Sequence, residues 1–161
     1  MIYTEHAIVK LYEKSLAEAE AKLASLAVAE GRTPGARGLS GWVFEKTIRY
    51  CLVQELRALG LTPDVSEQVP LSGRARADLG VGRAAIELKV RGSFGAGDSK
   101  YGGYRASAEK RGLAYLYLTM QETYAPYRDV TRATFGADKA FFLDAAGDWA
   151  RFVGTVAVLH A

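Results

Sequence analysis

The chain has 161 residues, of which 49% are hydrophobic, so it can bury one core and needs no second domain. It has no long apolar run and no secretory leader pattern, which predicts a cytoplasmic protein that makes no contact with membranes. The formal net charge is +3. The basic excess falls within residues 32–111, as expected for a protein whose partner is the phosphodiester backbone of DNA.

We divide the single domain into an N-terminal helical arm (1–31), a core (40–120) and a C-terminal completion (121–161). Cys51 is the only cysteine, which excludes internal disulfides and zinc sites built from cysteines. The two histidines lie at opposite ends of the chain, which disfavours sites that need histidine beside a nucleophile. The sequence also lacks the Gly-Lys-Ser/Thr triplet of a phosphate-binding P-loop, so we expect no nucleotide cofactor.

The arm is predicted to be a long helix rich in Ala, Glu and Lys. Its apolar residues recur every three or four positions, as in a heptad repeat: Val9, Tyr12, Leu16, Ala19, Leu23 and Leu26. The stripe has two interpretations, a dimerisation arm that makes a homodimer or a helix that packs against its own domain. The segment 31–38 would link the arm to the core, and Arg32 and Arg37 there are weak candidates for DNA contact.

The core is predicted to begin with a helix over residues 40–59. Ser40 can cap its N-terminus and Gly60 follows its last apolar residue as a stop signal. The apolar residues recur at helical spacing: Phe44, Ile48, Cys51 or Leu52, Leu56 and Leu59. Cys51 is therefore expected to be a packed core thiol.

Two short strands follow, over residues 74–79 and 85–90. In a strand, alternate residues share a face, so Arg74, Arg76 and Asp78 lie together on the first strand. Glu87 and Lys89 likewise share a face of the second strand. The sequence therefore predicts a charged sheet face with an apolar face behind it.

The position of the turn between these strands decides whether the charged residues meet. If the reversal is centred between Gly82 and Arg83, antiparallel pairing sets Asp78 opposite Glu87, and Arg76 opposite Lys89. A turn centred on Val81 would instead move Glu87 to the other face. A site made of both acids requires the first register or a bulge.

Asp78 and Glu87 carry hard oxygen ligands, which suit Mg2+, with Mn2+ as a substitute. An ion held there can activate water and neutralise charge at phosphorus. A lysine beside two acids adds a cation where negative charge develops, so Lys89 is a candidate for stabilising the transition state. The alternative is a solvated sheet face with ordinary cross-strand ion pairs.

Asp78 followed after eight residues by Glu87-Leu88-Lys89 resembles the active-site motif of the PD-(D/E)XK nuclease superfamily, which includes restriction enzymes and resolvases. Ala77 stands where the family often has proline. The resemblance implies a restriction-endonuclease-like α/β core, a mixed central sheet flanked by helices, here with a long N-terminal helix. The family order is helix, three antiparallel strands, helix and a parallel strand, and residues 40–120 offer the same order.

The resemblance also implies a further acidic ligand on the first core helix, for which Glu45 is the candidate. The alternative is a surface glutamate paired with Arg49 four residues later. The function implied is a Mg2+-dependent DNA endonuclease with Asp78, Glu87, Lys89 and Glu45 as catalytic residues. The alternative is a non-catalytic nucleic-acid-binding protein, or a subunit of a larger nuclease complex, that uses the same fold.

Five basic residues around the motif are candidates for contact with nucleic acid, although each alone can be a solvated surface charge: Arg74, Arg76, Arg91, Lys100 and Arg105. The glycine-rich segment 92–98 is expected to be a loop, either a DNA contact or a plain connector. A helix is predicted near 104–111, with Tyr104 in a packing role.

The remaining pattern completes the layers of an α/β domain. The apolar run 114–120 predicts a strand buried on both faces, with its tyrosines in the core. Pro126 is expected to start a helix that ends near Gly136, and a short strand is predicted at 141–143. The last helix is indicated by apolar residues at helical spacing: Trp149, Phe152, Val153 and Val156.

Overall fold

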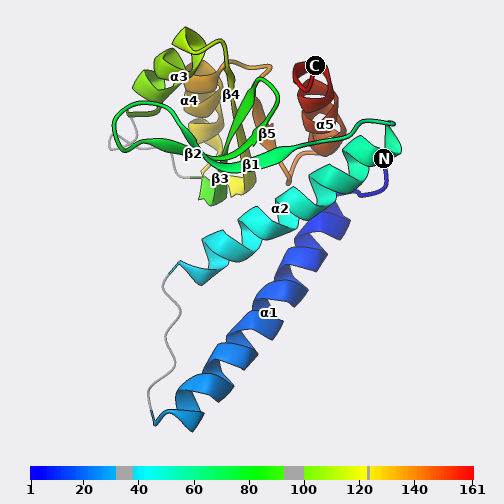
Figure 1. The fold of residues 1–161 in the computed structure, drawn as a ribbon, viewed down its shortest axis with the longest axis vertical. Coiled ribbons are helices and arrows are strands. Elements are labelled where there is room, and N and C mark those ends of the chain that lie inside the picture. The colour runs from blue at the N-terminus through cyan, green and yellow to red at the C-terminus, as the bar shows by residue number, and fades with distance from the viewer. Residues whose placement is uncertain (32–37, 93–99, 123) are drawn as a thin grey trace.

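The computed structural model describes residues 1–31, 38–92, 100–122 and 124–161. The fold is α/β, with one five-stranded mixed sheet flanked by helices (Figure 1). The strands follow one another across the sheet in chain order, β1-β2-β3-β4-β5. The interpretations of Arg32, of Arg37 and of the glycine-rich loop after Gly92 fall outside the described residues.

The strands are β1 (Val65–Pro70), β2 (Arg76–Val81), β3 (Ala84–Gly92), β4 (Ala114–Glu122) and β5 (Ala140–Phe142). β1, β2 and β3 pair antiparallel, whereas β3 with β4 and β4 with β5 pair parallel. The helices are α1 (Glu5–Ala29), α2 (Leu39–Ala58), α3 (Lys100–Lys110), α4 (Ala125–Phe135) and α5 (Asp148–Leu159). The element order expected for residues 40–120 is therefore the order observed, from α2 to β4.

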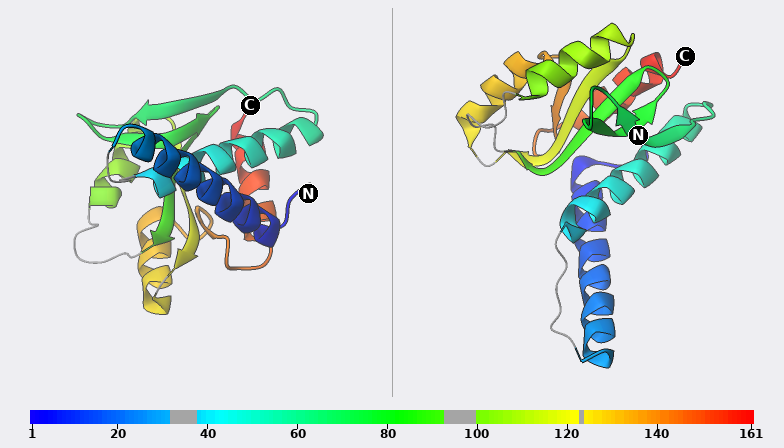
Figure 2. Two further views of the ribbon diagram at one scale, coloured as in Figure 1. Left: turned by 90° about the horizontal axis from the view of Figure 1, so that it is seen from below. Right: turned by 60° about the vertical axis from the view of Figure 1, so that its left-hand side comes forward.

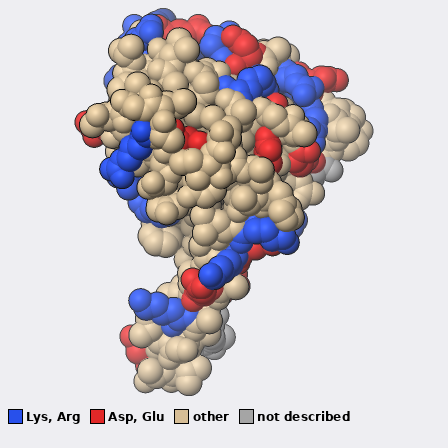
Figure 3. Space-filling model, turned by 90° about the vertical axis from the view of Figure 1, so that its right-hand side faces the viewer, with Lys and Arg blue, Asp and Glu red and all other residues tan. Residues whose placement is uncertain are grey.

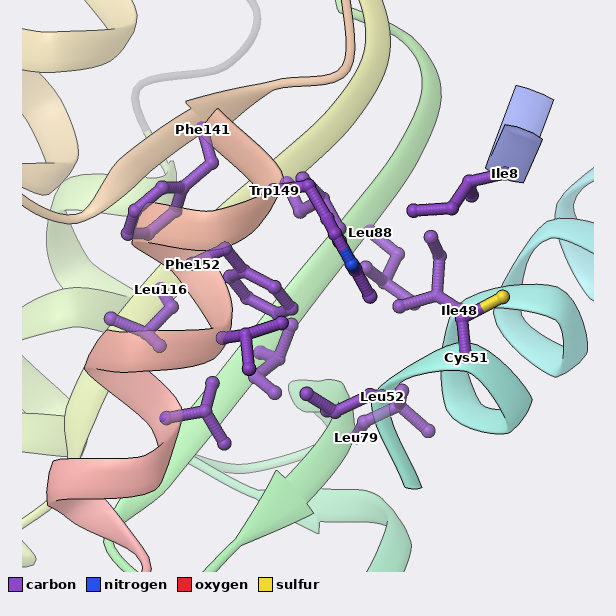
Figure 4. Packing of buried hydrophobic residues seen from close by; sticks show 14 of the residues in the cluster. Ile8, Ile48, Cys51, Leu52, Leu79, Leu88, Leu116, Phe141, Trp149 and Phe152 are labelled. Carbon is purple, nitrogen blue, oxygen red and sulfur yellow. The ribbon is translucent and has the colours of Figure 1, made fainter. Parts of the chain in front are cut away.

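Two apolar cores cover the two faces of the sheet. On one face α1, α2 and α5 pack against β3 and β4, and on the other face α3 and α4 cover the sheet (Figure 2). Figure 4 shows the first core, where Trp149 and Phe152 of α5 meet side chains of α2 and of the strands. Cys51 has no exposed surface, which confirms that it is a core thiol.

Helix α2 corrects one expectation about capping. The helix begins at Leu39 and its N-cap is Gly38, so Ser40 lies inside the first turn and does not cap it. Gly38 has the left-handed φ of 81°, and its carbonyl accepts a hydrogen bond from the N–H of Trp42. A glycine adopts that conformation without strain, which places the start earlier than the serine pattern suggested. At the other end Gly60, with φ of 79°, is confirmed as the stop.

The β2–β3 hairpin has the register that the two-acid site requires. Its pairs are Leu79↔Ile86, Gly80↔Ala85 and Val81↔Ala84, so the turn is centred between Gly82 and Arg83. Gly82 has φ of 53°, as the first residue of a two-residue hairpin loop often does. A Cβ on Gly82 would lie 2.5 Å from the carbonyl oxygen of Leu159, so no larger residue fits this turn.

The arm packs against its own domain over its first half. Ile8 and Tyr12 are buried, and the Tyr12 ring meets Phe44 of α2 edge-on at 5.7 Å. Farther along the same stripe Leu23 and Leu26 are exposed. This part of α1 forms a narrow extension that carries charges of both signs (Figure 3). The packing interpretation is therefore confirmed for the first half of the stripe.

The C-terminal elements agree with the sequence pattern. Strand β4 lies between β3 and β5 and is buried on both faces. Helix α4 has proline in its first turn and ends before Gly136. The four residues that predicted the last helix are all buried in α5. None of the helices in the described parts of the chain is both long and apolar enough to cross a membrane.

Candidate functional site

The candidate site lies where β2 and β3 separate. Their ladder ends at Leu79↔Ile86, although β2 begins three residues before Leu79 and β3 continues to Gly92. The next pair in this register is Asp78 and Glu87. Instead of closing another ladder pair, Asp78 accepts a hydrogen bond from the backbone N–H of Leu88 through its Oδ2 at 2.7 Å. The carboxylate thus occupies the gap between the two strands.

Glu45 reaches the same gap from the second turn of α2. Its carboxyl group lies within hydrogen-bonding reach of the carboxyl group of Asp78. Burial raises the pKa of both groups, and for Asp78 burial together with the nearby Glu45 raises the pKa to about 6. The acid that the family resemblance implied on this helix therefore contacts Asp78.

Glu87 and Lys89 form an ion pair beside these acids. The Lys89 Nζ lies 2.7 Å from the Glu87 Oε1, and the Glu87 side chain is only 7% exposed, against 40% for Lys89. Burial, with a further contribution from Asp78, raises the pKa of Glu87. Burial alone would lower the pKa of Lys89, but the adjacent Glu87 carboxylate raises it. Lys89 is therefore a cation at neutral pH.

Two tyrosines belong to this cluster. From the sequence, Tyr115 was assigned to the core and Tyr101 was not singled out. The hydroxyl of Tyr115 on β4 donates a hydrogen bond to the Glu87 Oε2 at 3.1 Å. The ring of Tyr101 on α3 lies with its centroid 5.8 Å from the Lys89 Nζ. The parallel register pairs Ala85 with Tyr115 and so places that tyrosine on the face of Glu87, but the sequence alone does not give this register.

Gln68 on the edge strand is a further residue that sequence reasoning missed. The β1–β2 register pairs Glu67 with Leu79 and Val69 with Ala77, which leaves Gln68 opposite Asp78. Gln68 has φ of 55°, a left-handed conformation that a non-glycine residue rarely adopts. Such strained residues concentrate at functional sites. No sequence pattern signals this one, because glutamine has no preference for that conformation.

Whether the site can hold a divalent metal depends on the carboxylate oxygens of its acids. Within the described residues no three His, Cys, Asp or Glu side chains converge as a metal-binding group. Both oxygens of Glu87 have other partners, Lys89 and Tyr115. The Glu45–Asp78 pair is different, because its two like charges lie close together and raise the pKa of Asp78. A divalent cation can neutralise such a pair, and Mg2+ is commonly held by only one or two carboxylates.

The five basic candidates lie apart from one another. Arg74 is in the turn before β2, so the expectation that it shares the strand face of Asp78 is wrong. Arg76 is in β2, but its guanidinium donates to the carbonyls of Gly73 and Ala75, and the ladder does not extend far enough to pair it with Lys89. Because of this turn, β2 begins at Arg76, two residues later than strand alternation suggested.

Of the others, Arg91 is exposed on β3. Lys100 begins α3, and its Nζ lies 5.3 Å from the centre of the Tyr101 ring. Arg105 binds Glu109 on its own helix and the carbonyl of Thr134 at 3.1 Å, so it ties α3 to α4. Arg76 and Arg91 therefore lie on the two strands of the site, and Lys100 lies beside Tyr101. Arg105 is held between α3 and α4 instead.

Comparison of the chain with protein-family models, with curated proteins and with solved structures gives no match.

Proposed function

We propose that this protein is a Mg2+-dependent endonuclease that hydrolyses phosphodiester bonds in DNA. The observation that carries the proposal is that two pairs of charged side chains, Glu45 with Asp78 and Glu87 with Lys89, lie next to each other where β2 and β3 separate. The four side chains come from α2, β2 and β3. Three acids and one lysine in a partly buried site are the groups that phosphodiester hydrolysis needs, namely ligands for a hard cation and a fixed positive charge.

The fold supports assignment to a restriction-endonuclease-like core. The helix, the three antiparallel strands, the second helix and the parallel strand occur in that order from α2 to β4. The motif residues stand at the same places in this order as the resemblance implies, with the aspartate on the second strand and the Glu-x-Lys on the third. The proposal therefore uses both the element order and the positions of the acids.

Glu45 and Asp78 are the residues that would hold Mg2+ or Mn2+, with Glu87 as the third acid beside them. The ion, when bound, would supply a polarised water and neutralise negative charge at phosphorus. The donors fit, because two partly buried carboxyl groups that raise the pKa of Asp78 by their proximity are neutralised well by a divalent cation.

The chain's own residues would orient and stabilise the reacting phosphate. Lys89 is held by Glu87 at 2.7 Å and keeps its proton, so it acts as a fixed positive charge beside the attacked phosphorus. Tyr115 holds Glu87 from the opposite side through its hydroxyl. Asp78 is held by the Leu88 N–H, which limits the rotation of its carboxylate. These contacts organise the site before substrate arrives.

The test is cleavage of several DNA forms by the purified protein. Supercoiled plasmid, linear duplex, single-stranded and branched DNA would be incubated with Mg2+, Mn2+ or EDTA. Lys89→Ala is the test variant, and Lys10→Ala on the exposed surface of α1 is the control. We expect metal-dependent cleavage by the wild type and the control, and none by Lys89→Ala.

The rival function is DNA binding without cleavage, alone or as a subunit of a larger nuclease complex. One observation favours it: within the described segments no three ligating side chains converge on one point. If the protein retains DNA in a gel shift but cleaves no form of DNA with either metal, binding without cleavage is the better assignment. Cleavage that appears only after adding a partner fraction would assign the chain to a complex.

A further inference from the structure

A groove with a volume of about 380 Å3 runs between α1 and α2. Figure 1 shows the two helices side by side, opening away from each other toward the end of α1. Leu11 and Ala19 line the groove from α1, and Trp42, Val43 and Tyr50 line it from α2. The lining is mainly apolar, and the groove is open to solvent.

Two large aromatic side chains stand exposed at this groove. Trp42 is 55% exposed and Tyr50 is 54% exposed, although both lie on a helix whose other face is fully buried. The Lys46 Nζ lies 5.8 Å from the centre of the Trp42 ring, so a cation accompanies the aromatic face. Exposed aromatic surface next to a cation is the combination that binds nucleobases together with their phosphates.

The groove and the candidate site share helix α2. Trp42 precedes Glu45 by three residues, which places the two side chains on neighbouring positions of one helix surface, about 4.5 Å apart along the axis. Lys46 and Arg49 continue this surface and contact Glu67 of the edge strand. A strand lying along it would pass from the groove to the acids within one or two nucleotides.

The charge of this surface favours an anionic occupant. Lys46 lies 2.5 Å and Arg49 lies 3.8 Å from the Glu67 Oε1, and all three side chains are exposed. Exposed ion pairs of this kind contribute little free energy, so a phosphate can take the place of Glu67 as the partner of either cation. An apolar protein segment would gain nothing from these two charges.

We infer that the groove between α1 and α2 binds the bases of an unpaired DNA strand, with Trp42 as the stacking platform, so that the protein acts on single-stranded or frayed substrates. That the bound strand is a substrate rests on the proposed function, whereas the binding itself rests on the groove alone. A paired duplex does not offer the face of a base to an aromatic ring, whereas every unpaired base does. The selectivity for unpaired DNA follows from that difference.

The test uses the fluorescence of Trp42. The chain has two tryptophans, and Trp149 is only 1% exposed, so quenching by a bound base reports on Trp42. Oligothymidylate and a duplex of equal length would be titrated into the full-length protein in EDTA, where cleavage is absent. We expect oligothymidylate to quench the emission and duplex to quench it much less.

Variants separate stacking from charge. Trp42→Ala is expected to weaken oligothymidylate binding about tenfold, measured by anisotropy of a labelled oligonucleotide, while Trp42→Phe retains a ring and loses less. Tyr124→Ala removes an equally exposed aromatic at the start of α4 and is the matched control. Circular dichroism of each variant checks that the helices are intact. Equal affinity of Trp42→Ala and wild type would overturn the inference.

The remaining outcomes distinguish this inference from the proposed function. Plasmid cleavage without Trp42 quenching by oligothymidylate overturns the groove inference and leaves the nuclease standing. Quenching without cleavage of any DNA form overturns the nuclease and supports the groove as a binding site. A third outcome is tryptophan emission that changes with protein concentration alone, together with dimers in sedimentation that Trp42→Ala abolishes. This outcome would show that a second copy of the chain fills the groove, and it would overturn the inference.

Discussion

The carboxylate of Asp78 accepts a hydrogen bond from the backbone N–H of Leu88 at 2.7 Å, across the gap where β2 and β3 separate. Leu88 itself points into the core and is 5% exposed. One residue therefore anchors the hairpin with its side chain and fixes an acid of the site with its backbone. The site acquires its rigidity from the core beneath it.

Replacing Lys89 is expected to abolish cleavage while leaving the fold intact. Lys89→Ala removes the only cation that contacts Glu87 in the described structure, and the loss of one such stabilising charge typically costs ~100-fold or more in rate. Single-turnover cleavage of plasmid with saturating Mg2+ measures it. DNA affinity within about threefold of wild type would show that the loss lies in chemistry, and undiminished cleavage would remove Lys89 from the mechanism.

Asp78→Asn is expected to stabilise the metal-free protein at neutral pH. Burial, with the nearby Glu45, raises the pKa of Asp78 to about 6, above the value near 4 in an unfolded chain. The folded state therefore holds the proton more tightly, and its stability falls as pH rises from about 4 to about 6. The penalty at pH 7 is up to about 3 kcal/mol. Asparagine has no charge to bury.

Urea unfolding in EDTA at pH 4 and pH 7 measures this effect. The variant should gain over wild type at pH 7 and show little difference at pH 4, where Asp78 is protonated. Asp64→Asn, on the loop before β1, is the control for removal of one acid. If the wild type is at least as stable as Asp78→Asn at pH 7, the proximity of Glu45 and Asp78 does not destabilise the folded protein.

Tyr115→Phe is expected to lower the cleavage rate without unfolding the protein. The ring keeps its packing against Phe135, whose centroid lies 5.1 Å away, but the hydrogen bond to Glu87 is lost. Partners that orient a metal-binding or catalytic carboxylate typically contribute about tenfold or more. The Mg2+ dependence of cleavage measures the change. Tyr127→Phe on α4 is the matched control, and an unchanged metal dependence in Tyr115→Phe would assign Tyr115 to packing alone.

The sequence predicted the acids and the lysine because strand alternation is a short-range rule. Glu87 and Lys89 share a face whatever surrounds them, and Gly82 fixed the register that sets Asp78 opposite Glu87. Tyr115 was assigned to the core because an apolar strand gives no sign of which hydroxyl will meet a carboxylate. Arg74 was misplaced because the turn before β2 extends further than alternation indicates.

Glu55 is expected to be a structural acid whose removal costs stability and leaves cleavage unchanged. Its buried carboxylate accepts hydrogen bonds from the backbone N–H groups of Ile2 and Tyr3 and from the Trp149 indole. Burial raises its pKa, but these donors outweigh burial and lower it. The stabilisation is therefore present at neutral pH and lost as pH falls through the lowered pKa.

Glu55→Gln should cost about 2–4 kcal/mol at pH 7, because three donors, one of them the buried Trp149 indole, lose a charged acceptor. Glu13→Gln on the exposed face of α1 is the matched control, and chemical unfolding at pH 7 and pH 3 measures both. A cost that persists undiminished at pH 3 would argue against the charged carboxylate as the source.

Gly82→Ala is expected to destabilise the protein by at least ~2 kcal/mol, because φ of 53° disfavours a side chain and the new Cβ would meet the Leu159 carbonyl at 2.5 Å. Gly73→Ala is the control, since Gly73 has the same φ of 53° but open space around it. Thermal unfolding of both variants separates backbone strain from collision. Equal losses would show that strain alone matters.

The hydrogen bond from the Arg83 N–H to the Leu159 carbonyl, at 2.8 Å, joins the hairpin turn to a residue made 76 positions later. During synthesis, a chain that has not yet reached Leu159 lacks the support for the turn that aligns Asp78 with Glu87. The hairpin turn would then gain its full support only after α5 has been translated and docked. Under the proposed function, the site would be completed by the last element of the chain to fold.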